Sequence, residues 1–240
     1  MREFDDYLAL SFDCYGTLID WETGIAAAMR PWADRHRLGM DDDELVAAFG
    51  AVETVVEGED PGAAYPEVLA EVLRRIGAEH GVKVSEADAT AFGGSVGDWP
   101  AFPDSAEALA RLGERYRLLI LSNVDRRSFA ASNRRLGVTF DRIITAEDVG
   151  SYKPDPANFA ALLDAVAADG IDRTRLLHVA ESLYHDHEPA AAAGIDSVWI
   201  HRRFDRDGHG ATHPPLTEVT PRWRFTSLAA FADTALDPTE

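Results

Sequence analysis

Four short segments of the chain each place a polar side chain just after a run of apolar residues. In chain order, these side chains are Asp13, Ser122 with Asn123, Lys153, and Glu181 with Asp186. In open α/β sheets, ligands bind outside the carboxyl ends of the strands. If the apolar runs are parallel strands, these carboxylates, hydroxyl, amide and ammonium groups meet at one edge of a sheet. Such a set can form a covalent ester and hydrolyse it.

Asp13 is the candidate nucleophile, because a carboxylate can attack carbon or phosphorus to give an ester that water later hydrolyses. An isolated aspartate in a turn usually only caps it, but the other three motifs favour a functional role here. The Thr17 hydroxyl can donate to Asp13 or to a bound oxyanion. Cys14 has no histidine within its motif to activate it, so we expect packing rather than thiol chemistry. We expect Cys14, Tyr15 and Trp21 to line the substrate pocket.

Lys153 is expected to hold Asp13 ionised and to neutralise charge on the substrate, because a nearby cation favours a carboxylate. Ser122 and Asn123 are expected to help hold the nucleophile and the substrate. Three roles remain open for Asp186: pairing with Lys153, activating the hydrolytic water, or capping the following helix.

A magnesium site is also open at the same edge, with Asp13, Glu181 and Asp186 supplying oxygen ligands. His185 and His187 flank Asp186, but alternate residues in a loop rarely face one ion.

The hydrophobic pattern predicts an α/β fold, a doubly wound parallel sheet with a helical cap inserted after the first strand. Residues 8–12 form the first expected strand, and residues 21–97 show helical spacing without a strand-like run. Strands are then expected at 116–121, 142–145, 176–179 and 197–200, alternating with helices at 127–136, 156–168 and 188–193. A weak strand and helix end the chain. We therefore expect a core domain of residues 1–20 and 99–240 and a cap of residues 21–98.

Composition and charge limit the partners. The 240 residues include 23 basic and 42 acidic side chains, a net charge of −19, which disfavours nucleic acid and anionic membranes as partners. The single cysteine excludes an internal disulfide and fits a reducing compartment. No apolar segment approaches the roughly 18 residues of a membrane span, and no apolar signal core follows Met1, so a cytoplasmic protein is expected. A homodimer is compatible with the sequence, but no feature demands one.

These motifs, in this order, resemble those of the haloacid dehalogenase superfamily over nearly the whole chain. The resemblance rests on residues 13–17 (Asp-Cys-Tyr-Gly-Thr), 121–123, 152–155 and 181–186. It implies an aspartyl-ester hydrolase. Phosphatases of the superfamily usually carry a second aspartate as general acid at the position that Tyr15 occupies here. Tyrosine there resembles the L-2-haloacid dehalogenase branch, in which halide leaves without a proton, so that no general acid is required.

Other positions depart from that branch. Its members usually carry a cap arginine that binds halide or the substrate carboxylate, but residues 47–49 contain none. Arg30, Arg35 and Arg74 remain as substitutes, and the sequence selects none of them. Phe159 stands where an aromatic hydroxyl is expected, and the acidic Glu181 resembles the magnesium-dependent phosphatases.

Three functions therefore follow from the sequence. The favoured one is a 2-haloacid dehalogenase-like enzyme, acting on a small anionic organic acid without a cofactor; the observation behind it is Tyr15. The alternative is a magnesium-dependent phosphatase acting on a small phosphate ester. A non-catalytic binding protein is the third, and it need not keep buried charges such as Asp13, Lys153 and Asp186, which are costly.

Overall fold

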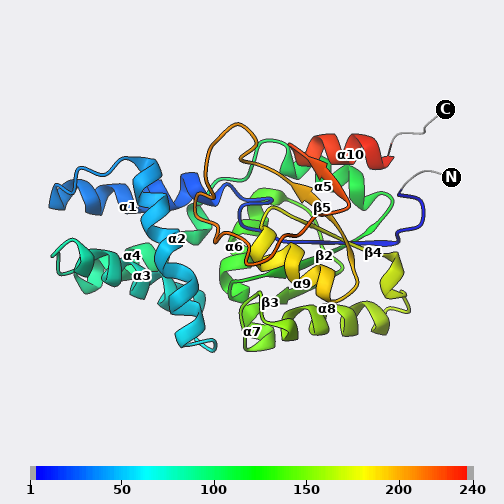
Figure 1. Cartoon of the computed structure of the whole chain (residues 1–240), viewed down its shortest axis with the longest axis horizontal. Coiled ribbons are helices and arrows are strands. Elements are labelled where there is room, and N and C mark those ends of the chain that lie inside the picture. Colours follow the sequence, from blue (N-terminus) through cyan, green and yellow to red (C-terminus); the bar gives the residue numbers. More distant parts are fainter. Residues whose placement is uncertain (1–3, 237–240) are drawn as a thin grey trace.

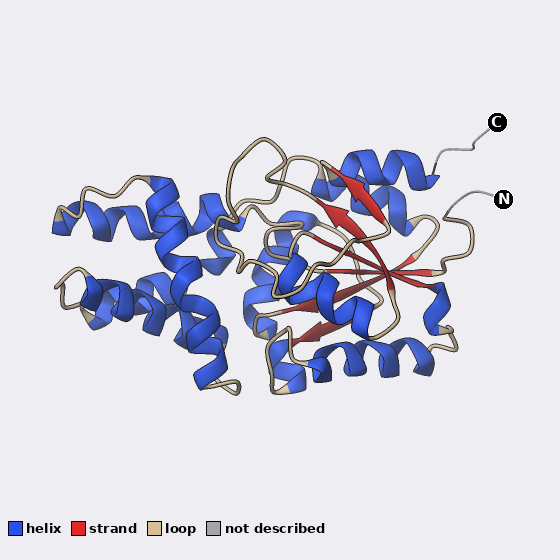
Figure 2. Ribbon diagram, in the orientation of Figure 1, coloured by secondary structure: helices blue, strands red, loops and turns tan. Residues whose placement is uncertain are grey.

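The computed structural model describes residues 4–236 and contains a parallel six-stranded sheet in the order β3-β2-β1-β4-β5-β6. Its strands are β1 (Ala9–Phe12), β2 (Arg117–Ser122), β3 (Arg142–Thr145), β4 (Leu176–Ala180), β5 (Asp196–Ile200) and β6 (Trp223–Phe225). Helices cover both faces of the sheet (Figures 1 and 2). The predicted α/β fold class is confirmed, and the weakly expected last strand is β6.

Alternation along the strands explains the two helical layers, because successive side chains of a strand point to opposite faces. In β2, Leu118 and Ile120 belong to the cluster that includes α5 (Ser105–Gly113), α6 (Arg126–Leu136) and α10 (Leu228–Leu236). Leu119 and Leu121 pack on the other face against α8 (Pro156–Ala168) and α9 (Glu188–Ala192). The short helix α7 (Ala146–Val149), which the sequence did not predict, follows β3.

The segment between β1 and α5 is helical, as its spacing indicated. It contains α1 (Trp21–His36), α2 (Asp42–Glu59), α3 (Tyr65–Glu79), α4 (Glu86–Gly93) and a short 3-10 turn (Ser95–Asp98). In α3, apolar residues at helical spacing form a buried stripe that packs on α2 and α4. Figure 1 shows these helices gathered at one end of the molecule, away from the sheet. The division into a core and a cap at residues 20 and 98 stays a prediction.

The helical segment is joined closely to the loop after β1. Gly24 of α1 lies against Trp99, and a Cβ atom added at Gly24 would lie 2.3 Å from a ring carbon of that tryptophan. The Trp99 ring in turn meets Tyr15 edge to face, with ring centroids 5.6 Å apart. The Tyr15 hydroxyl and the Ser132 hydroxyl of α6 share a hydrogen bond of 2.8 Å. The loop that carries Asp13 is therefore held both through Trp99 by α1 and through Ser132 by α6.

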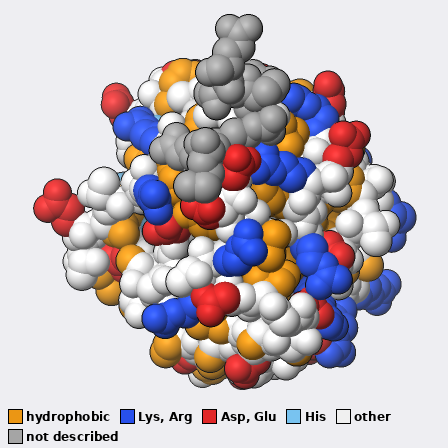
Figure 3. All heavy atoms as spheres, turned by 90° about the vertical axis from the view of Figure 1, so that its right-hand side faces the viewer, with side chains coloured by type: hydrophobic (Ala, Val, Ile, Leu, Met, Phe, Trp, Pro, Cys, Tyr) orange, Lys and Arg blue, Asp and Glu red, His pale blue; other side chains and the backbone are white. Residues whose placement is uncertain are grey.

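Basic and acidic side chains alternate on the end of the molecule farthest from α1–α4, despite the net charge of −19 (Figure 3). One ion pair there joins Arg111 of α5 to Asp233 of α10 at 2.6 Å. Across residues 4–236, none of the helices combines the length and apolar character that crossing a membrane requires.

Candidate active site

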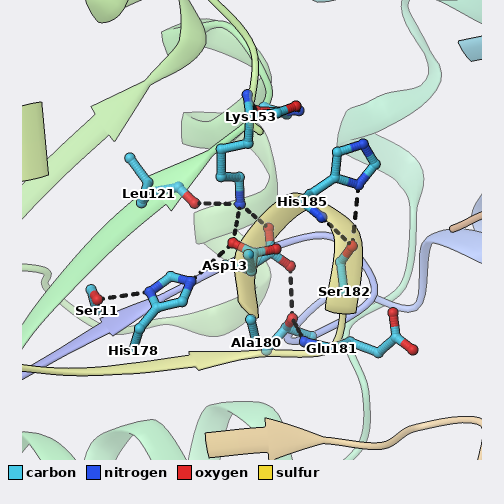
Figure 4. Close-up of polar contacts among 12 residues, drawn as sticks. Ser11, Asp13, Leu121, Lys153, His178, Ala180, Glu181, Ser182 and His185 are labelled. Atoms are coloured by element: carbon cyan, nitrogen blue, oxygen red, sulfur yellow. Dashed lines mark hydrogen bonds and ion pairs between the residues drawn. The ribbon is translucent and has the colours of Figure 1, made fainter. Parts of the chain in front are cut away.

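The polar residues predicted from the sequence meet at the carboxyl ends of β1, β2 and β4, where the strand order reverses between β1 and β4. Asp13 directly follows β1, and its backbone N–H donates to the Val179 carbonyl of β4 at 3.1 Å. Asp186 lies in a π-helical turn (Leu183–His187) that follows β4. Lys153 reaches the same point from the segment between α7 and α8 (Figure 4).

Lys153 lies at the centre of the site and is 2% exposed. Its Nζ donates to Asp13 Oδ1 at 2.9 Å, to Asp186 Oδ1 at 2.6 Å and to the Leu121 carbonyl at 3.0 Å. These contacts use all three donors of an ammonium group. Burial alone would lower the pKa of Lys153, but the two carboxylates outweigh burial and raise it above its usual range. The lysine is therefore charged throughout the neutral range.

Asp13 is held at both carboxylate oxygens. Besides the bond to Lys153, its Oδ2 accepts from the Thr17 hydroxyl at 2.7 Å. The same hydroxyl accepts from the backbone N–H of Glu181 at 2.9 Å, which ties the loops after β1 and β4 together. Gly16 has a φ of 88°, and an added Cβ atom would meet Trp21 Nε1 at 3.0 Å, so the turn requires glycine. Burial raises the pKa of Asp13, while Lys153 and Thr17 oppose that shift.

The two carboxylate oxygens of Asp186 differ, because Oδ1 makes two side-chain hydrogen bonds and Oδ2 makes none with the described residues. Oδ1 accepts from Lys153 and also bonds His178 Nε2 at 2.9 Å, and His178 Nδ1 bonds the Ser11 hydroxyl at 2.8 Å. Oδ2 is buried and has no hydrogen-bond partner among residues 4–236. Burial would raise the pKa of Asp186, but Lys153 and His178 hold it below its usual range. The N-cap residue of the following helix α9 is His187, with no side-chain cap hydrogen bond, so the helix-cap alternative for Asp186 is wrong. The unpaired oxygen of Asp186 is a carboxylate oxygen of the site.

The two residues after β2 differ in what they do. Asn123 clamps the backbone of Lys153: its Oδ1 accepts from the lysine N–H at 2.6 Å and its Nδ2 donates to the lysine carbonyl at 3.0 Å. The Ser122 hydroxyl is buried and has no hydrogen-bond partner within the described chain. Asn123 therefore positions the lysine, and the Ser122 hydroxyl is not committed to a protein partner.

A small cavity with a volume of about 30 Å³ adjoins these groups. Its lining includes the predicted residues Asp13, Tyr15, Trp21, Asn123, Lys153 and Asp186. It also includes residues that the sequence analysis did not select: Glu53, Glu57, Tyr65, Ser182, His185 and Thr212. A volume of this size holds about two water molecules. A cavity of this volume suits only a small ligand.

Cys14 is not part of the cavity lining, which corrects its expected place in the pocket. Its side chain is fully buried in the hydrophobic cluster. Burial, together with the charge of Asp13, raises the pKa of the thiol, so that Cys14 stays protonated and packs as a small apolar residue. Thr17 and Ser122 lie one layer behind the lining, in contact with or next to residues that reach it.

The predicted magnesium set of Asp13, Glu181 and Asp186 does not assemble. Glu181 Oε2 accepts from the Thr212 hydroxyl at 3.1 Å, and Figure 4 shows the side chain extending away from Asp13. Burial raises the pKa of Glu181 to about 8, which favours its neutral form at neutral pH. In the described part of the chain, no group of three or more His, Cys, Asp or Glu side chains is arranged to hold a metal. The residues present do not fit a bound magnesium ion, and we derive no step through one.

The two histidines beside Asp186 point to separate partners. His187 bonds the Ser197 hydroxyl at 2.8 Å and the Ala180 carbonyl at 3.1 Å. His185 Nδ1 bonds the Ser182 hydroxyl at 3.2 Å. Burial lowers the pKa of each histidine to about 4, so both are neutral at neutral pH. The expectation that they do not share an ion agrees with these contacts.

The three candidate cap arginines pair with acidic side chains outside the cavity. Arg30 donates to Asp42, Arg35 to Asp88, and Arg74 to Glu86. None of the three belongs to the described lining of the cavity, where Lys153 is the one lysine or arginine. The structure therefore selects no arginine for a substrate anion.

The sequence analysis did not identify Glu53 and Glu57, two acidic residues that line the cavity. They continue the stripe of Leu45 and Phe49 along α2, since each lies four residues after the last. Both are 4% exposed. Carboxyl groups on the apolar stripe of an amphipathic helix are rare, because burying them is costly. That pattern was the sequence feature that could have identified them.

Comparison with known proteins shows the family to which the chain is similar. A family model described as a haloacid dehalogenase-like hydrolase matches residues 7–194. A curated (S)-2-haloacid dehalogenase from Pseudomonas sp. (strain YL) is 31% identical over 136 residues, which are 55% of this chain and 52% of that protein. The match thus spans about half the length of that relative.

Solved structures show the same fold. One is an L-2-haloacid dehalogenase from Xanthobacter autotrophicus with chloropropionic acid covalently bound (TM-score 0.76, 18% identity, 94% of this chain and 97% of that one). Another is the putative hydrolase YfnB from Bacillus subtilis bound to magnesium (TM-score 0.77, 17% identity, 98% and 99% covered). At these identities the likeness concerns the fold alone.

Proposed function

The chain belongs to the haloacid dehalogenase-like hydrolases, and we propose that within this family of enzymes it is a 2-haloacid dehalogenase working through an ester of Asp13. Its substrate is a short, anionic 2-halo carboxylic acid, and no cofactor takes part. The observation that carries the proposal is the buried pairing of Asp13 with Lys153 at 2.9 Å, on the wall of a cavity that Asp186 shares. The curated relative, itself a dehalogenase, supports this choice.

In the first step, a carboxylate oxygen of Asp13 attacks the carbon that bears the halogen. A carbon–oxygen bond forms, the carbon–halogen bond breaks, and the halide leaves with the bonding electron pair. Lys153 and Thr17 hold the carboxylate in place through bonds to its two oxygens. Such positioning of a nucleophile beside its target accelerates the reaction by removing the entropy cost of encounter.

The leaving group explains the residue at position 15. Halide departs as a stable anion, so no acid has to protonate it. Tyr15 lines the cavity, but its hydroxyl is engaged with Ser132 at 2.8 Å and burial raises its pKa well above the usual value. Tyr15 is therefore a wall of the cavity rather than a proton donor, which suits halide and does not suit a phosphate ester.

In the second step, water attacks the carbonyl carbon of the Asp13 ester. The free Oδ2 of Asp186, held as a carboxylate by Lys153, is the base that accepts the proton of this water. The oxyanion forms on the Asp13 oxygen that is not part of the ester, and the donor on that oxygen, Lys153 for Oδ1 or Thr17 for Oδ2, can stabilise it. Collapse of the tetrahedral intermediate breaks the bond between Asp13 Cγ and the oxygen attached to the substrate carbon. The leaving alkoxide takes the remaining proton of the attacking water, which gives the 2-hydroxy acid and the Asp13 carboxylate, and Asp186 releases its proton to solvent.

The test is to trap the ester. The Asp186→Asn variant, which lacks the base, is incubated with 2-chloropropionate, and the peptide that contains residue 13 is analysed by mass spectrometry. We expect a 1-carboxyethyl group on Asp13 and one halide released per chain. A single turnover of the wild type in ¹⁸O-labelled water is expected to label Asp13 and not the product.

The matched control is Asp13→Asn, which keeps the size of the side chain and removes the nucleophile, and we expect neither adduct nor halide. Phosphate esters with and without magnesium complete the panel. Release of phosphate that depends on magnesium, with no halide from any 2-halo acid, would overturn the proposal.

A further inference from the structure

Two buried carboxyl groups of α2 face the cavity without a cation of their own. Glu53 and Glu57 are each 4% exposed, and both line the cavity together with Asp13 and Asp186. Within the described lining, Lys153 is the one lysine or arginine, and its three donors are already used by the site below. A buried carboxylate that lacks a cation is strongly destabilised, and the usual outcome is that the group binds a proton.

The hydrogen bonds of the two glutamates differ. Glu53 Oε1 accepts from the Tyr65 hydroxyl at 2.6 Å. Glu57 has a long contact of 3.5 Å from Asn123 Nδ2 to its Oε2, and Asn123 already donates to the Lys153 carbonyl at the shorter distance of 3.0 Å. The carboxyl group of Glu57 is therefore the less committed of the two.

The charged and titratable groups around Glu57 come from four elements. Glu53 lies on the same helix, Tyr65 on α3, Tyr152 and Lys153 before α8, and Tyr184 in the turn after β4. Burial and the neighbouring Glu53 raise the pKa of Glu57 well above its usual value, and Lys153 opposes them only in part. Burial likewise raises the pKa of Glu53 to about 7.

A separate observation indicates that a polar ligand belongs in this cavity. His185 lines it and is 7% exposed, yet its Nε2 has no hydrogen-bond partner within residues 4–236. The buried Asp186 Oδ2 likewise has no hydrogen-bond partner within residues 4–236. Native proteins satisfy nearly all buried polar atoms, so groups left open on one cavity point to a bound molecule that completes them.

We propose that Glu57 binds the substrate as a neutral carboxylic acid, donating its hydroxyl hydrogen to the substrate's carboxylate. It thus takes the part expected of a cap arginine, and the described lining of the cavity contains no arginine. The inference rests on the proposed function, because it assumes an anionic 2-halo acid. No proton is transferred: the hydrogen stays on Glu57 throughout binding and release.

Charge decides between the two forms of Glu57. A carboxylate at this position would repel the substrate anion, and it would add to the negative charge of Asp13 and Asp186. A neutral carboxyl group offers one O–H donor, and hydrogen bonds to an ionised acceptor are about twice as strong as those between neutral groups.

The test uses Glu57→Gln, which keeps a donor in the side chain and cannot ionise, and Glu57→Leu, which has no donor. For the wild type, we expect kcat/KM for 2-chloropropionate to fall as the pH rises through the pKa of Glu57. Glu57→Gln is expected to retain activity and to lose this alkaline fall. For Glu57→Leu, we expect KM to rise about 10- to 100-fold, the effect of losing one hydrogen bond to a charged group. Asp43→Asn, an exposed change on the same helix, is expected to match the wild type.

A binding measurement keeps this inference separate from the proposed function. Calorimetry with propionate, an unreactive analogue, is expected to show proton uptake on binding to the wild type at alkaline pH and none for Glu57→Gln. If no 2-halo acid releases halide, the proposed function fails, and the propionate result still decides the role of Glu57. Loss of binding in Glu57→Gln, or binding to the wild type that strengthens as the pH rises, would overturn the inference.

Discussion

Replacing Lys153 with methionine removes the ammonium group that Asp13 and Asp186 share. All three side chains are almost fully buried, at 2%, 6% and 1% exposure. Breaking a buried ion pair by removing one partner costs about 3–5 kcal/mol, because the remaining charge is left uncompensated. For a chain of this size, each kcal/mol lowers Tm by about 2–4 °C. We therefore expect Lys153→Met to lower Tm by about 6–20 °C at neutral pH.

The loss of stability depends on pH with a definite sign. In the wild type the pKa of Asp186 lies below its usual range, so its contribution to stability is present above the unfolded pKa and is lost as the pH falls through the folded pKa. Without Lys153, burial raises the pKa of both carboxyl groups in the folded variant. Their penalty is then absent at acid pH and grows as the pH rises. Both effects increase the difference in Tm between the wild type and Lys153→Met as the pH rises from about 4.

Thermal unfolding followed by far-ultraviolet circular dichroism at acid and at weakly alkaline pH measures this gap. Lys83→Met is the matched control, because Lys83 is the chain's other lysine and is exposed. Adding Asp186→Asn to Lys153→Met removes one of the two unpaired carboxylates and is expected to recover part of the lost Tm. An equal loss of Tm at both pH values, or a variant as stable as the wild type at alkaline pH, would refute the reasoning.

Three further predictions follow. Thr17→Val removes the hydroxyl that donates to Asp13 Oδ2 and accepts from the Glu181 N–H. Leaving a buried polar group unpaired costs about 1–3 kcal/mol, so we expect kcat to fall about 10- to 100-fold. An unchanged kcat in steady-state halide assays would contradict this. Gly24→Ala places a Cβ atom 2.3 Å from a Trp99 ring carbon, and overpacking of about 1–3 kcal/mol should lower Tm. The control in the calorimetry is Gly58→Ala, because a Cβ atom added there meets no atom within 4 Å. Because the proposed displacement uses Lys153 to hold the charge, halide release is expected to survive EDTA, and restoration by magnesium after its loss would count against the mechanism.

Most of the residues in the site could be predicted because they come shortly after an expected strand. Asp13, Asn123 and Asp186 follow β1, β2 and β4, Lys153 follows the helix α7, and all four line one cavity. This works because a parallel sheet brings the carboxyl ends of its strands together, whatever the details of packing. Short-range pattern is enough to place such residues.

Contacts between segments distant in the sequence decided which partner each polar side chain has. Sequence could not tell that Arg30 pairs with Asp42, or that Glu181 turns to Thr212, since either side chain can reach several partners from its backbone position. Nor could it tell that Glu57 faces Asn123, 66 residues further along the chain.

The sequence by itself determined the fold class and the identity of the chemical groups at the sheet edge, because periodicity and strand-end position are local properties of the chain. Tertiary structure alone decided which carboxyl groups are paired, which are left open, and that α2 supplies two acids to the cavity. Burial and neighbouring charge set the protonation of each group, and both arise only when α2 meets the loops that follow the strands.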